Sequence, residues 1–370
     1  MRHLNIVHSE ASLGWGGQEI RIYTEMLAMR SRGHEMSLAA QPTSQIFHKA
    51  QAAGFTVFPI REKALFFPHS ILSLTAWLKK RRPDVVNTHS SKDGWIGGIA
   101  ARLAHVPCII RSKHIDVEYP RRFSSRIAYG VLPHHVLTTS EQIRKKISDQ
   151  LKISLDHITN LPTGIDPQPF LNSTPASLRE ELGLNPETAL VGMISVIRSW
   201  KGHRFFLEAA AILLRQRPDL HFIIAGDGPG AASLQESIQE RGLNERFFWL
   251  GQRQDVPQLL KALNVLVLPS TAHEGVPQII LQAQMARCPV VASAVGGIPE
   301  VVQDGLTGRL VPVGQSQALA DAISSALTDH ELTQTMVQTA YARCLVENTI
   351  EVMCKRSEAI YAQLLGLQAL

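Results

Sequence analysis

Short apolar runs alternate with amphipathic stretches of helical length along almost the whole chain. The runs have the length of buried strands, and apolar residues recur at helical spacing between them. This alternation is typical of an α/β fold with parallel sheets. The pattern predicts strands at Leu4–His8, Glu35–Ala40, Thr56–Pro59, Val85–Thr88, Cys108–Arg111 and Val136–Thr139, and again at Leu190–Val196, His221–Ala225, Phe247–Leu250, Val265–Leu268 and Val290–Ala292.

The alternation is interrupted once, between Asp166 and Leu190, where Pro, Ser, Asn and Thr are frequent and periodicity is weak. We interpret 166–189 as a linker that joins two Rossmann-like doubly wound parallel-sheet domains, 1–165 and 190–345. Open α/β sheets bind ligands at the carboxyl ends of their strands, so two facing domains would share a cleft there. A last helix is expected within 346–370.

The loop after Val265–Leu268 carries the most informative motif. Its residues run Pro269-Ser270-Thr271-Ala272-His273-Glu274-Gly275-Val276-Pro277-Gln278, and a helix is expected to open at Pro277. Proline is favoured just inside a helix start, free N–H groups there favour an anion, and glycine allows close backbone approach. Glu274 precedes Gln282 by eight residues, about 12 Å of helix. The motif predicts a sugar at Glu274, a diphosphate at Gly275, Val276, Pro277 and Gln278, and a ribose at Gln282.

Two cations lie in the loop after Leu190–Val196, which reads Arg198-Ser199-Trp200-Lys201-Gly202-His203. Arg198 and Lys201 would neutralise a leaving diphosphate, and stabilising charge that develops in the transition state is a large source of catalysis. The plainer alternative is a solvated basic loop.

Two glycine-rich loops also follow predicted strands. Gly16 and Gly17 precede a helix, where glycines let backbone N–H groups approach a phosphate. Gly226 and Gly228 lie in Gly226-Asp227-Gly228-Pro229-Gly230 and permit a tight turn with close ligand approach. A plain tight turn is the alternative for the loop of Gly16 and Gly17. The first loop is not the dinucleotide fingerprint, because its sixth position is Glu19.

Together these motifs resemble the retaining nucleotide-sugar glycosyltransferases of family four, which have the GT-B fold. The family has two glutamates separated by seven residues; Glu274 matches the first, and Gln282 stands at the second. Glutamine would hold a ribose hydroxyl without charge assistance. The Gly-Gly pair, the Arg198 and Lys201 pair, Gly226-Asp227-Gly228-Pro229 and Leu161–Asp166 resemble further family segments in family order.

The resemblance implies a hexosyltransferase that takes a hexose-type sugar from a nucleoside-diphosphate sugar, with UDP favoured over GDP. The implied acceptor is a glycan or lipid-linked molecule of bacterial envelope polysaccharide or lipopolysaccharide synthesis. The donor would bind the second domain and the acceptor the first, with the last helix packing back on the first. In this family the acceptor hydroxyl is thought to attack from the leaving group's own face, so no enzyme nucleophile is required.

The resemblance also assigns roles outside the main motif. His114, expected just past Cys108–Arg111, would contact the donor sugar or the acceptor, and His89 is a weaker candidate on the acceptor side. A packing histidine is the alternative for both. His273 is expected only to shape its loop. Asp255 lies in a segment that would bracket the base, and it is also placed to cap the following helix.

Composition narrows the picture further. The 370 residues fit two domains, with no signal-peptide layout and no apolar run long enough to span a bilayer. Through position 170 there are 22 Lys and Arg against 13 Asp and Glu; the remainder has 15 against 19. The basic first half suggests an anionic acceptor or the anionic inner face of a membrane, although a solvated surface is as good an explanation. We expect a cytoplasmic protein, in part peripheral on the membrane, with no nucleic-acid partner.

One helix shows both possibilities. Ile71, Leu74 and Leu78 fall on one face of a predicted helix that ends in Lys79-Lys80-Arg81-Arg82, after the segment 61–67. Such a helix can dock on anionic lipid. The favoured interpretation is a core-facing helix whose basic end complements its dipole.

The sequence lacks the motifs of several other kinds of enzyme. The sequence has no Asp-x-Asp motif, no nucleophile elbow, no phosphate loop ending in Gly-Lys-Ser or Gly-Lys-Thr, and four scattered cysteines. We therefore expect no metal and no cofactor. The alternatives left open are a sugar-nucleotide epimerase or hydrolase of the same fold, a nicotinamide-dependent oxidoreductase, and a binding subunit whose activity has decayed.

Overall fold

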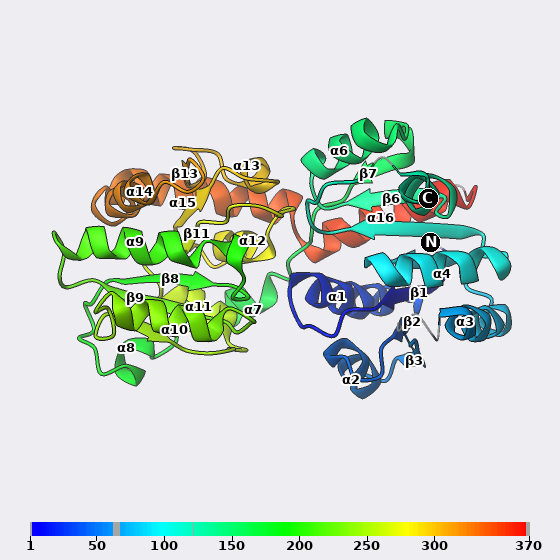
Figure 1. Cartoon of the computed structure of the whole chain (residues 1–370), viewed down its shortest axis with the longest axis horizontal. Helices are drawn as coiled ribbons and strands as arrows, with labels where there is room; N and C mark the ends of the chain where they lie inside the picture. The colour runs from blue at the N-terminus through cyan, green and yellow to red at the C-terminus, as the bar shows by residue number, and fades with distance from the viewer. Residues whose placement is uncertain (1, 62–66, 121, 368–370) are drawn as a thin grey trace. The chain divides into compact units, whose positions relative to one another are not determined.

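The computed structural model describes residues 2–61, 67–120 and 122–367. It divides into two compact units, one formed by Met1–Gly164 with Ile350–Leu370 and the other by Ile165–Thr349 (Figure 1). Each unit contains its own parallel sheet covered by helices, so the chain has the predicted two-domain α/β architecture. Residues 62–66, which belong to the segment 61–67 before the helix with the basic end, lie outside the described residues.

The first unit has a seven-stranded sheet with the order β3-β2-β1-β4-β5-β6-β7, and its neighbouring strands are parallel. The strands predicted in the first half are all present, and a short β7 is added. β1 extends past the predicted end at His8, because Ser9 and Glu10 are buried despite their polarity. The strands are β1 (Asn5–Glu10), β2 (Glu35–Ala40), β3 (Thr56–Pro59), β4 (Val85–Thr88), β5 (Cys108–Lys113), β6 (His135–Thr138) and β7 (Ile158–Asn160).

Helices cover this sheet, and the last helix of the chain, α16, packs on the first helix, α1. Arg32 donates two hydrogen bonds of 2.7 Å to the carboxylate of Glu358, which also lies 3.0 Å from the ring of His34. This bidentate pair ties α16 to the end of α1 (Figure 1). The helices are α1 (Gly17–Ser31), α2 (Gln45–Ala52), α3 (Phe67–Arg81), α4 (Ser91–Leu103), α5 (Phe123–Arg126), α6 (Glu141–Leu151) and α16 (Ile350–Leu364).

The helix with the basic end is α3. Leu74 and Leu78 are buried, and Ile71 packs against the same apolar cluster, which α3 shares with α4. Its apolar face is therefore covered within the unit, as the core-facing interpretation predicts. The basic end remains outside this core, where Arg81 pairs with Glu35.

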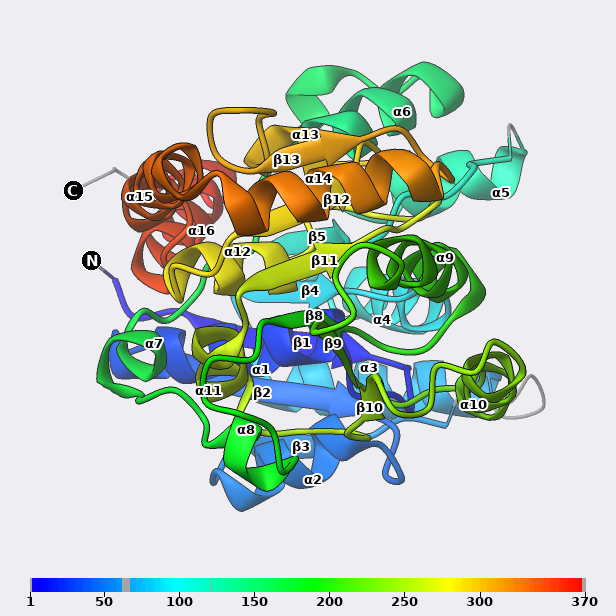
Figure 2. The same ribbon diagram turned by 90° about the vertical axis from the view of Figure 1, so that its left-hand side faces the viewer.

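The second unit has a six-stranded parallel sheet with the order β10-β9-β8-β11-β12-β13 (Figure 2). Its strands are β8 (Leu190–Ile194), β9 (His221–Ala225), β10 (Phe247–Trp249), β11 (Val265–Leu268), β12 (Val290–Ser293) and β13 (Arg309–Val311). Its helices are α7 (Gln168–Asn172), α8 (Leu178–Glu181), α9 (His203–Leu214), α10 (Ala231–Glu240), α11 (Val256–Ala262), α12 (Gln278–Met285), α13 (Ile298–Val301), α14 (Ser316–Thr328) and α15 (His330–Glu347).

The stretch 166–189, expected as a linker, lies within the second unit. It forms the short helices α7 and α8, and Phe170 and Leu178 are buried in the core beside α11. Ala176, Leu182 and Leu184 pack against the same core, but α7 and α8 are only five and four residues long, too short to show a periodic sequence pattern.

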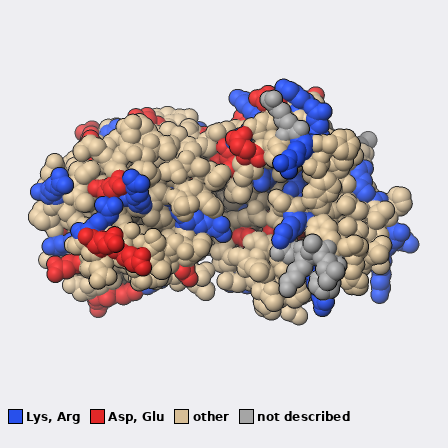
Figure 3. Space-filling view, viewed as in Figure 1, with Lys and Arg blue, Asp and Glu red and all other residues tan. Residues whose placement is uncertain are grey.

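Both sheets reverse their strand order at one place, between β1 and β4 in the first unit and between β8 and β11 in the second. Ligands of doubly wound sheets bind at such switch points, outside the carboxyl ends of the strands. The loops that follow these strands contain most of the predicted site residues. Among the charged side chains visible in Figure 3, Lys and Arg predominate on the first unit, whereas the second unit displays both basic and acidic side chains close together.

Candidate active site

The centre of the candidate site in the second unit is a buried carboxylate. Glu274 accepts a hydrogen bond of 2.6 Å from the Lys201 ammonium and another of 2.6 Å from the Ser270 hydroxyl, both at Oε1. Glu274 is 5% exposed, and Ser270 is fully buried. Oε2 has no hydrogen bond from the described residues, so one carboxylate oxygen stays available to a ligand.

This pair is assembled by two neighbouring strands. Lys201 closes the short turn Ser199–Lys201 after β8, Glu274 lies in the loop after β11, and β8 pairs with β11. Gly202 has φ +79°, and a side chain there would place its Cβ 1.8 Å from the Pro269 carbonyl oxygen. The Thr271 amide also donates to the Trp200 carbonyl at 2.8 Å. The loops therefore contact one another through backbone, which fixes the two side chains.

A third loop holds Glu274 from the other side. The Gly297 amide donates to the Glu274 carbonyl at 3.2 Å. Gly296 has φ +58°, and a Cβ there would lie 2.1 Å from the same carbonyl oxygen. Because α13 follows this loop, the end of β12 positions the backbone that carries the carboxylate.

Arg198 is held by an aromatic side chain. Its guanidinium carbon lies 5.1 Å from the centroid of the Trp200 ring, and the His273 ring meets Trp200 edge-on at 5.4 Å. Among the described residues no carboxylate pairs with Arg198, so its N–H groups remain free for an anion. His273 adopts a left-handed backbone, φ 62°, as a loop-shaping residue would.

The packing of two loops requires glycine at positions 226 and 228. Side chains there would place a Cβ 1.9 Å from the Ser195 carbonyl oxygen and 2.5 Å from the Ile197 carbonyl oxygen. The Ile197 amide also donates to the Asp227 carbonyl at 2.9 Å. The glycines thus allow the turn after β9 to pack on the loop after β8, whether or not a ligand lies beside them.

Helix α12 begins one residue later than predicted. Pro277 is its N-cap, with an extended ψ of 125°, and the helix starts at Gln278. No side chain caps it, so the first-turn N–H groups are not satisfied that way. Gly275 and Val276 are buried beside the cap, and the buried Oε1 of Gln278 has no hydrogen-bond partner. Gln282 is half-buried one turn further on.

In the first unit, Gly16 is the N-cap of α1 and Gly17 its first residue. The Gly16 amide donates to the Glu19 carboxylate at 2.9 Å. Glu10, at the end of β1, accepts from the Ser12 amide at 2.7 Å and from the side chain of Gln18. The buried carboxyl groups of Glu10 and Glu19 therefore hold the glycine-rich loop.

His114 follows β5 and is nearly buried, at 9% exposure. The Thr139 hydroxyl donates to its carbonyl at 3.0 Å, and its Nε2 lies 2.9 Å from the Nδ1 of His89. His89 follows β4 and reaches His8 of β1 with its other nitrogen, at 2.8 Å. The structure thus joins the two histidines that the sequence analysis singled out and adds a third.

Comparisons with known proteins identify the family. The model of group 1 glycosyl transferases matches residues 176–343, and that of glycosyltransferase family 4 matches residues 15–169. The chain is 32% identical over 281 residues to the UDP-Gal:alpha-D-GlcNAc-diphosphoundecaprenol alpha-1,3-galactosyltransferase of Escherichia coli, covering 71% of each protein. The chain belongs to the family-four glycosyltransferases.

Solved structures give the same fold over the whole chain. A glycosyltransferase from Rickettsia africae superposes with a TM-score of 0.88 at 19% identity and covers 99% of each chain. Anabaena HepE, solved with UDP and glucose, superposes with a TM-score of 0.86 at 22% identity and covers 98% of this chain and 100% of its own. This glycosyltransferase therefore has the GT-B fold that its motifs implied.

One expectation about the glycosyltransferase is wrong. Asp255 occupies the N-cap position of α11, but its side chain makes no cap. Its carboxylate instead accepts hydrogen bonds of 2.9 and 2.8 Å from Arg253, which also binds Glu181. This lowers the pKa of Asp255, mainly through the hydrogen bond from Arg253. A charge-assisted pair is stronger than a cap to a neutral amide.

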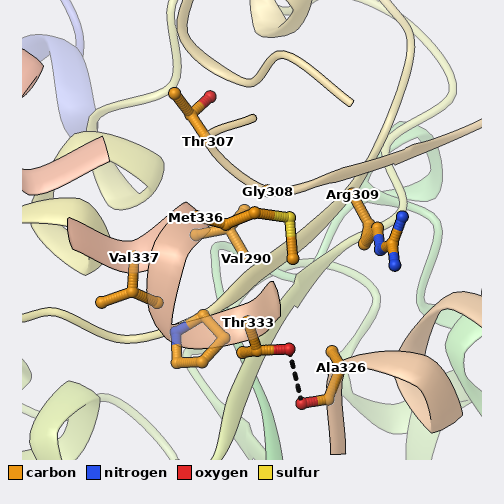
Figure 4. A pocket seen from close by; sticks show the side chains of 9 residues that line it. Val290, Thr307, Gly308, Arg309, Ala326, Thr333, Met336 and Val337 are labelled. Carbon is orange, nitrogen blue, oxygen red and sulfur yellow. Dashed lines mark hydrogen bonds between the residues drawn. The ribbon is translucent and has the colours of Figure 1, made fainter. Parts of the chain in front are cut away.

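A small pocket in the second unit of the glycosyltransferase lies away from the candidate site. It is enclosed by the start of β12, the loop before β13 and helices α14 and α15, and Thr333 donates to the Ala326 carbonyl at its rim (Figure 4). The lining is mostly apolar and includes Val290, Met336 and Val337. The pocket lies at the amino end of β12, opposite to the strand ends that carry Glu274.

The described ranges of this glycosyltransferase contain neither a metal-binding cluster nor a membrane-spanning helix. Within residues 2–61, 67–120 and 122–367, no group of three or more His, Cys, Asp or Glu is arranged to hold a metal ion. Within the same ranges, no helix has the length and apolar character needed to cross a membrane.

Sequence reasoning missed some residues of both sites. Ser270 and Gly296 lie inside the quoted motif but received no role, although a hydroxyl four residues before Glu274 was a usable signal. His8 was missed because it lies within a predicted strand. The sequence carried no signal for it, because only the order of β1, β4 and β5 in the sheet brings it within reach of His89.

Proposed function

We propose that the protein is a retaining, metal-independent hexosyltransferase that uses a nucleoside-diphosphate sugar, with UDP favoured over GDP. The observation that carries this is the Lys201–Glu274 pair at the switch point of the second unit. A carboxylate oxygen without a partner can accept a sugar hydroxyl beside an ammonium that has two further N–H groups for a diphosphate. Arg198 adds a second cation at the same loop.

In this proposal each group has one task. Glu274 holds a hydroxyl of the donor sugar through Oε2. Lys201, Arg198 and the uncapped start of α12 stabilise the charge that develops on the departing diphosphate. Gly275, Val276, Pro277 and Gln278 form the surface beside the diphosphate. Gln282 reaches the ribose.

Four further binding roles belong to the proposal. Gly226 and Gly228 line the nucleotide side, and Asp255 lies near the base, where its pairing with Arg253 fixes its position. In the first unit, Gly16 and Gly17 lie beside the diphosphate and the acceptor, and His114 contacts the donor sugar or the acceptor.

The names of the relatives support the proposed class of substrates. The Escherichia coli relative is named for a UDP-galactose donor and a diphosphoundecaprenol acceptor, and HepE was solved with UDP and glucose. We infer a glycan or lipid-linked acceptor of bacterial envelope polysaccharide or lipopolysaccharide synthesis. The basic first half of the chain supports an anionic acceptor and a cytoplasmic protein in peripheral contact with the inner membrane face.

The first experiment is thermal unfolding of the purified protein with UDP, GDP, ADP, NAD and the UDP- and GDP-sugars, in buffer containing a metal chelator. Ligand at a hundred times its Kd adds about 2.7 kcal/mol to the free energy of unfolding. We expect stabilisation by UDP and one UDP-sugar. Stabilisation by NAD alone would overturn the proposal.

Turnover of the stabilising sugar nucleotide then separates the remaining alternatives. With a lipid-linked acceptor, a transferase forms a glycoside whose anomeric configuration, read by NMR, matches the donor. Release of free sugar at the same rate without acceptor would identify a hydrolase, and a changed sugar nucleotide would identify an epimerase. Binding without any turnover would identify a decayed binding subunit.

A further inference from the structure

Three histidines of the first unit form an unbroken hydrogen-bonded chain. Nδ1 of His8 lies 2.8 Å from Nε2 of His89, and Nδ1 of His89 lies 2.9 Å from Nε2 of His114. Adjacent rings also stack, with centroids 5.0 and 5.1 Å apart. Because β1, β4 and β5 are neighbours in the sheet, the chain crosses the switch point between β1 and β4.

All three rings are neutral near pH 7. Burial is the largest cause that lowers the pKa of His8, His89 and His114, and the neighbouring rings and arginines lower the pKa of His89 further. A neutral imidazole has one N–H donor and one lone pair. Each ring therefore gives at most one hydrogen bond and accepts at most one.

Because each ring has one donor and one acceptor, the tautomers of the three rings are coupled. His89 uses both of its nitrogens, so it donates one bond and accepts the other, and both bonds of the chain run in the same direction. If they run toward His114, the proton of His114 is on Nδ1. If they run toward His8, His114 carries its proton on Nε2 and presents a lone pair at Nδ1. Nδ1 of His114 has no hydrogen-bond partner among the described residues, so it is the nitrogen open to a ligand.

Charged side chains also lie near the chain. His8 is near the buried pair of Arg21 and Glu25 on α1, whose Nε and Oε2 are 4.0 Å apart. Glu25 raises the pKa of His8, whereas Arg21 lowers the pKa of all three histidines. The hydrogen-bond geometry itself couples the three tautomers, whichever way the bonds run.

We propose that His8 and His89 are positioning residues that hold the His114 ring and couple its tautomer to their own, leaving Nδ1 of His114 to bond a substrate hydroxyl. The identity of that substrate as a sugar rests on the proposed function. The coupling itself does not, because it follows from the hydrogen bonds between the three rings.

The first test is NMR of the full-length protein labelled with ¹⁵N-histidine, with no ligand added. His8, His89 and His114 are expected to carry their protons on the same ring nitrogen, all on Nε2 or all on Nδ1. His89→Phe keeps the ring but removes both hydrogen bonds, so the His114 signals should shift toward a mixture of tautomers. His135→Phe is the matched control, since His135 is also buried in this unit but bonds Thr159. His8→Phe is a second variant, which cuts the chain one link further from His114.

The second test is steady-state kinetics with the donor found by the thermal screen. Loss of an orienting partner should lower kcat of His89→Phe about tenfold, the loss seen when the partner that orients a metal-ligating histidine is removed. KM for the donor should be nearly unchanged. Different tautomers among His8, His89 and His114 in the wild-type protein would overturn the proposal, as would His114 signals unaffected by His89→Phe. If no sugar nucleotide is turned over, the proposed function fails, but the NMR result still decides the tautomer.

Discussion

The Lys201 ammonium lies 2.6 Å from Oε1 of Glu274, and both side chains are largely withdrawn from solvent. The pair joins loops 73 residues apart in the chain. Breaking a buried pair by removing one partner is costly because it leaves the other charge unpaired. The pair should therefore matter both for stability and for catalysis.

The double-mutant cycle of this pair is the first prediction. Lys201→Met and Glu274→Gln should each lower kcat by roughly 10²- to 10³-fold, the usual loss when one preorganised charged or polar group is removed. Their effects on unfolding should not add, because the two side chains share one interaction. The measurement is kcat together with the denaturation midpoint for both single variants and the double variant.

The surface pair of Lys355 and Glu351 provides a matched control, since its atoms are 2.7 Å apart but more than 60% of each side chain is exposed. Lys355→Met should change stability by less than about 1 kcal/mol and leave kcat unchanged. Wild-type kcat in Glu274→Gln would contradict the assignment of Glu274 to the donor sugar.

Gly296 gives the second prediction, because its missing side chain positions Glu274. Gly296→Ala would place a Cβ 2.1 Å from the Glu274 carbonyl oxygen, so the loop must move. Gly305→Ala has a similar φ, +71°, but its Cβ would meet nothing within 4 Å. The control should lose only about 1–2 kcal/mol from left-handed strain, with normal activity. Gly296→Ala should lose more stability and most of its kcat. Equal behaviour of both variants would show that the contact with Glu274 is unimportant.

Glu10 gives the third prediction, which concerns pH. Burial, together with the nearby carboxylates Asp93 and Glu19, raises the pKa of Glu10 to about 8. The folded protein therefore binds a proton that the unfolded chain loses near its ordinary pKa of 4.5. Stability should fall as pH rises from 4.5 to 8, by an amount on the order of a few kcal/mol.

Glu10→Gln should remove that part of the pH dependence. Urea midpoints at pH 5, 6, 7 and 8 should show the variant gaining on the wild type as pH rises. The lowered histidine pKa values act in the opposite sense, reducing stability as pH falls below 6.5, and they are common to both proteins. Exposed Glu240→Gln should leave the profile parallel to that of the wild type. Parallel profiles for Glu10→Gln as well would contradict the raised pKa.

Much of this fold was predictable because parallel strands buried on both faces are continuous apolar runs. The exceptions are polar. Ser9 and Glu10 extend β1 but do not look like strand residues, because the Ser9 hydroxyl bonds the buried Asp93 and Glu10 accepts from the following loop. The stretch 166–189 was expected as a linker for a related reason: the residues that it packs on the core are spread over α7 and α8, which are five and four residues long and too short to show a period.

The candidate site could be outlined from the sequence where one chain segment carries it, but not where the fold brings segments together. The motif around Glu274 is continuous, so its residue types led to the roles proposed for it. Its hydrogen bond with Lys201 depends on β8 lying beside β11, which the sequence order does not state. The same holds for His8, because only the order of β1, β4 and β5 brings it within reach of His89.

Gln282 gives the fourth prediction, since the family pattern has a glutamate at this position. Gln282 lies half-buried on α12, so a carboxylate there would meet the ribose with charge assistance. Gln282→Glu should tighten nucleotide binding about fivefold, the gain expected when a neutral hydrogen bond of about 1 kcal/mol becomes a charged one of about 2 kcal/mol. Calorimetric titration with UDP measures this directly.

Gln239→Glu is the control for added charge, because Gln239 is exposed on α10 of the same unit. It should leave the UDP affinity unchanged. An unchanged affinity in Gln282→Glu as well would mean that Gln282 does not contact the ribose, and the glutamine would then be no sign of weakened binding. A gain confined to Gln282→Glu would instead place the ribose at this turn of α12 and show that the natural protein holds its donor without the second carboxylate.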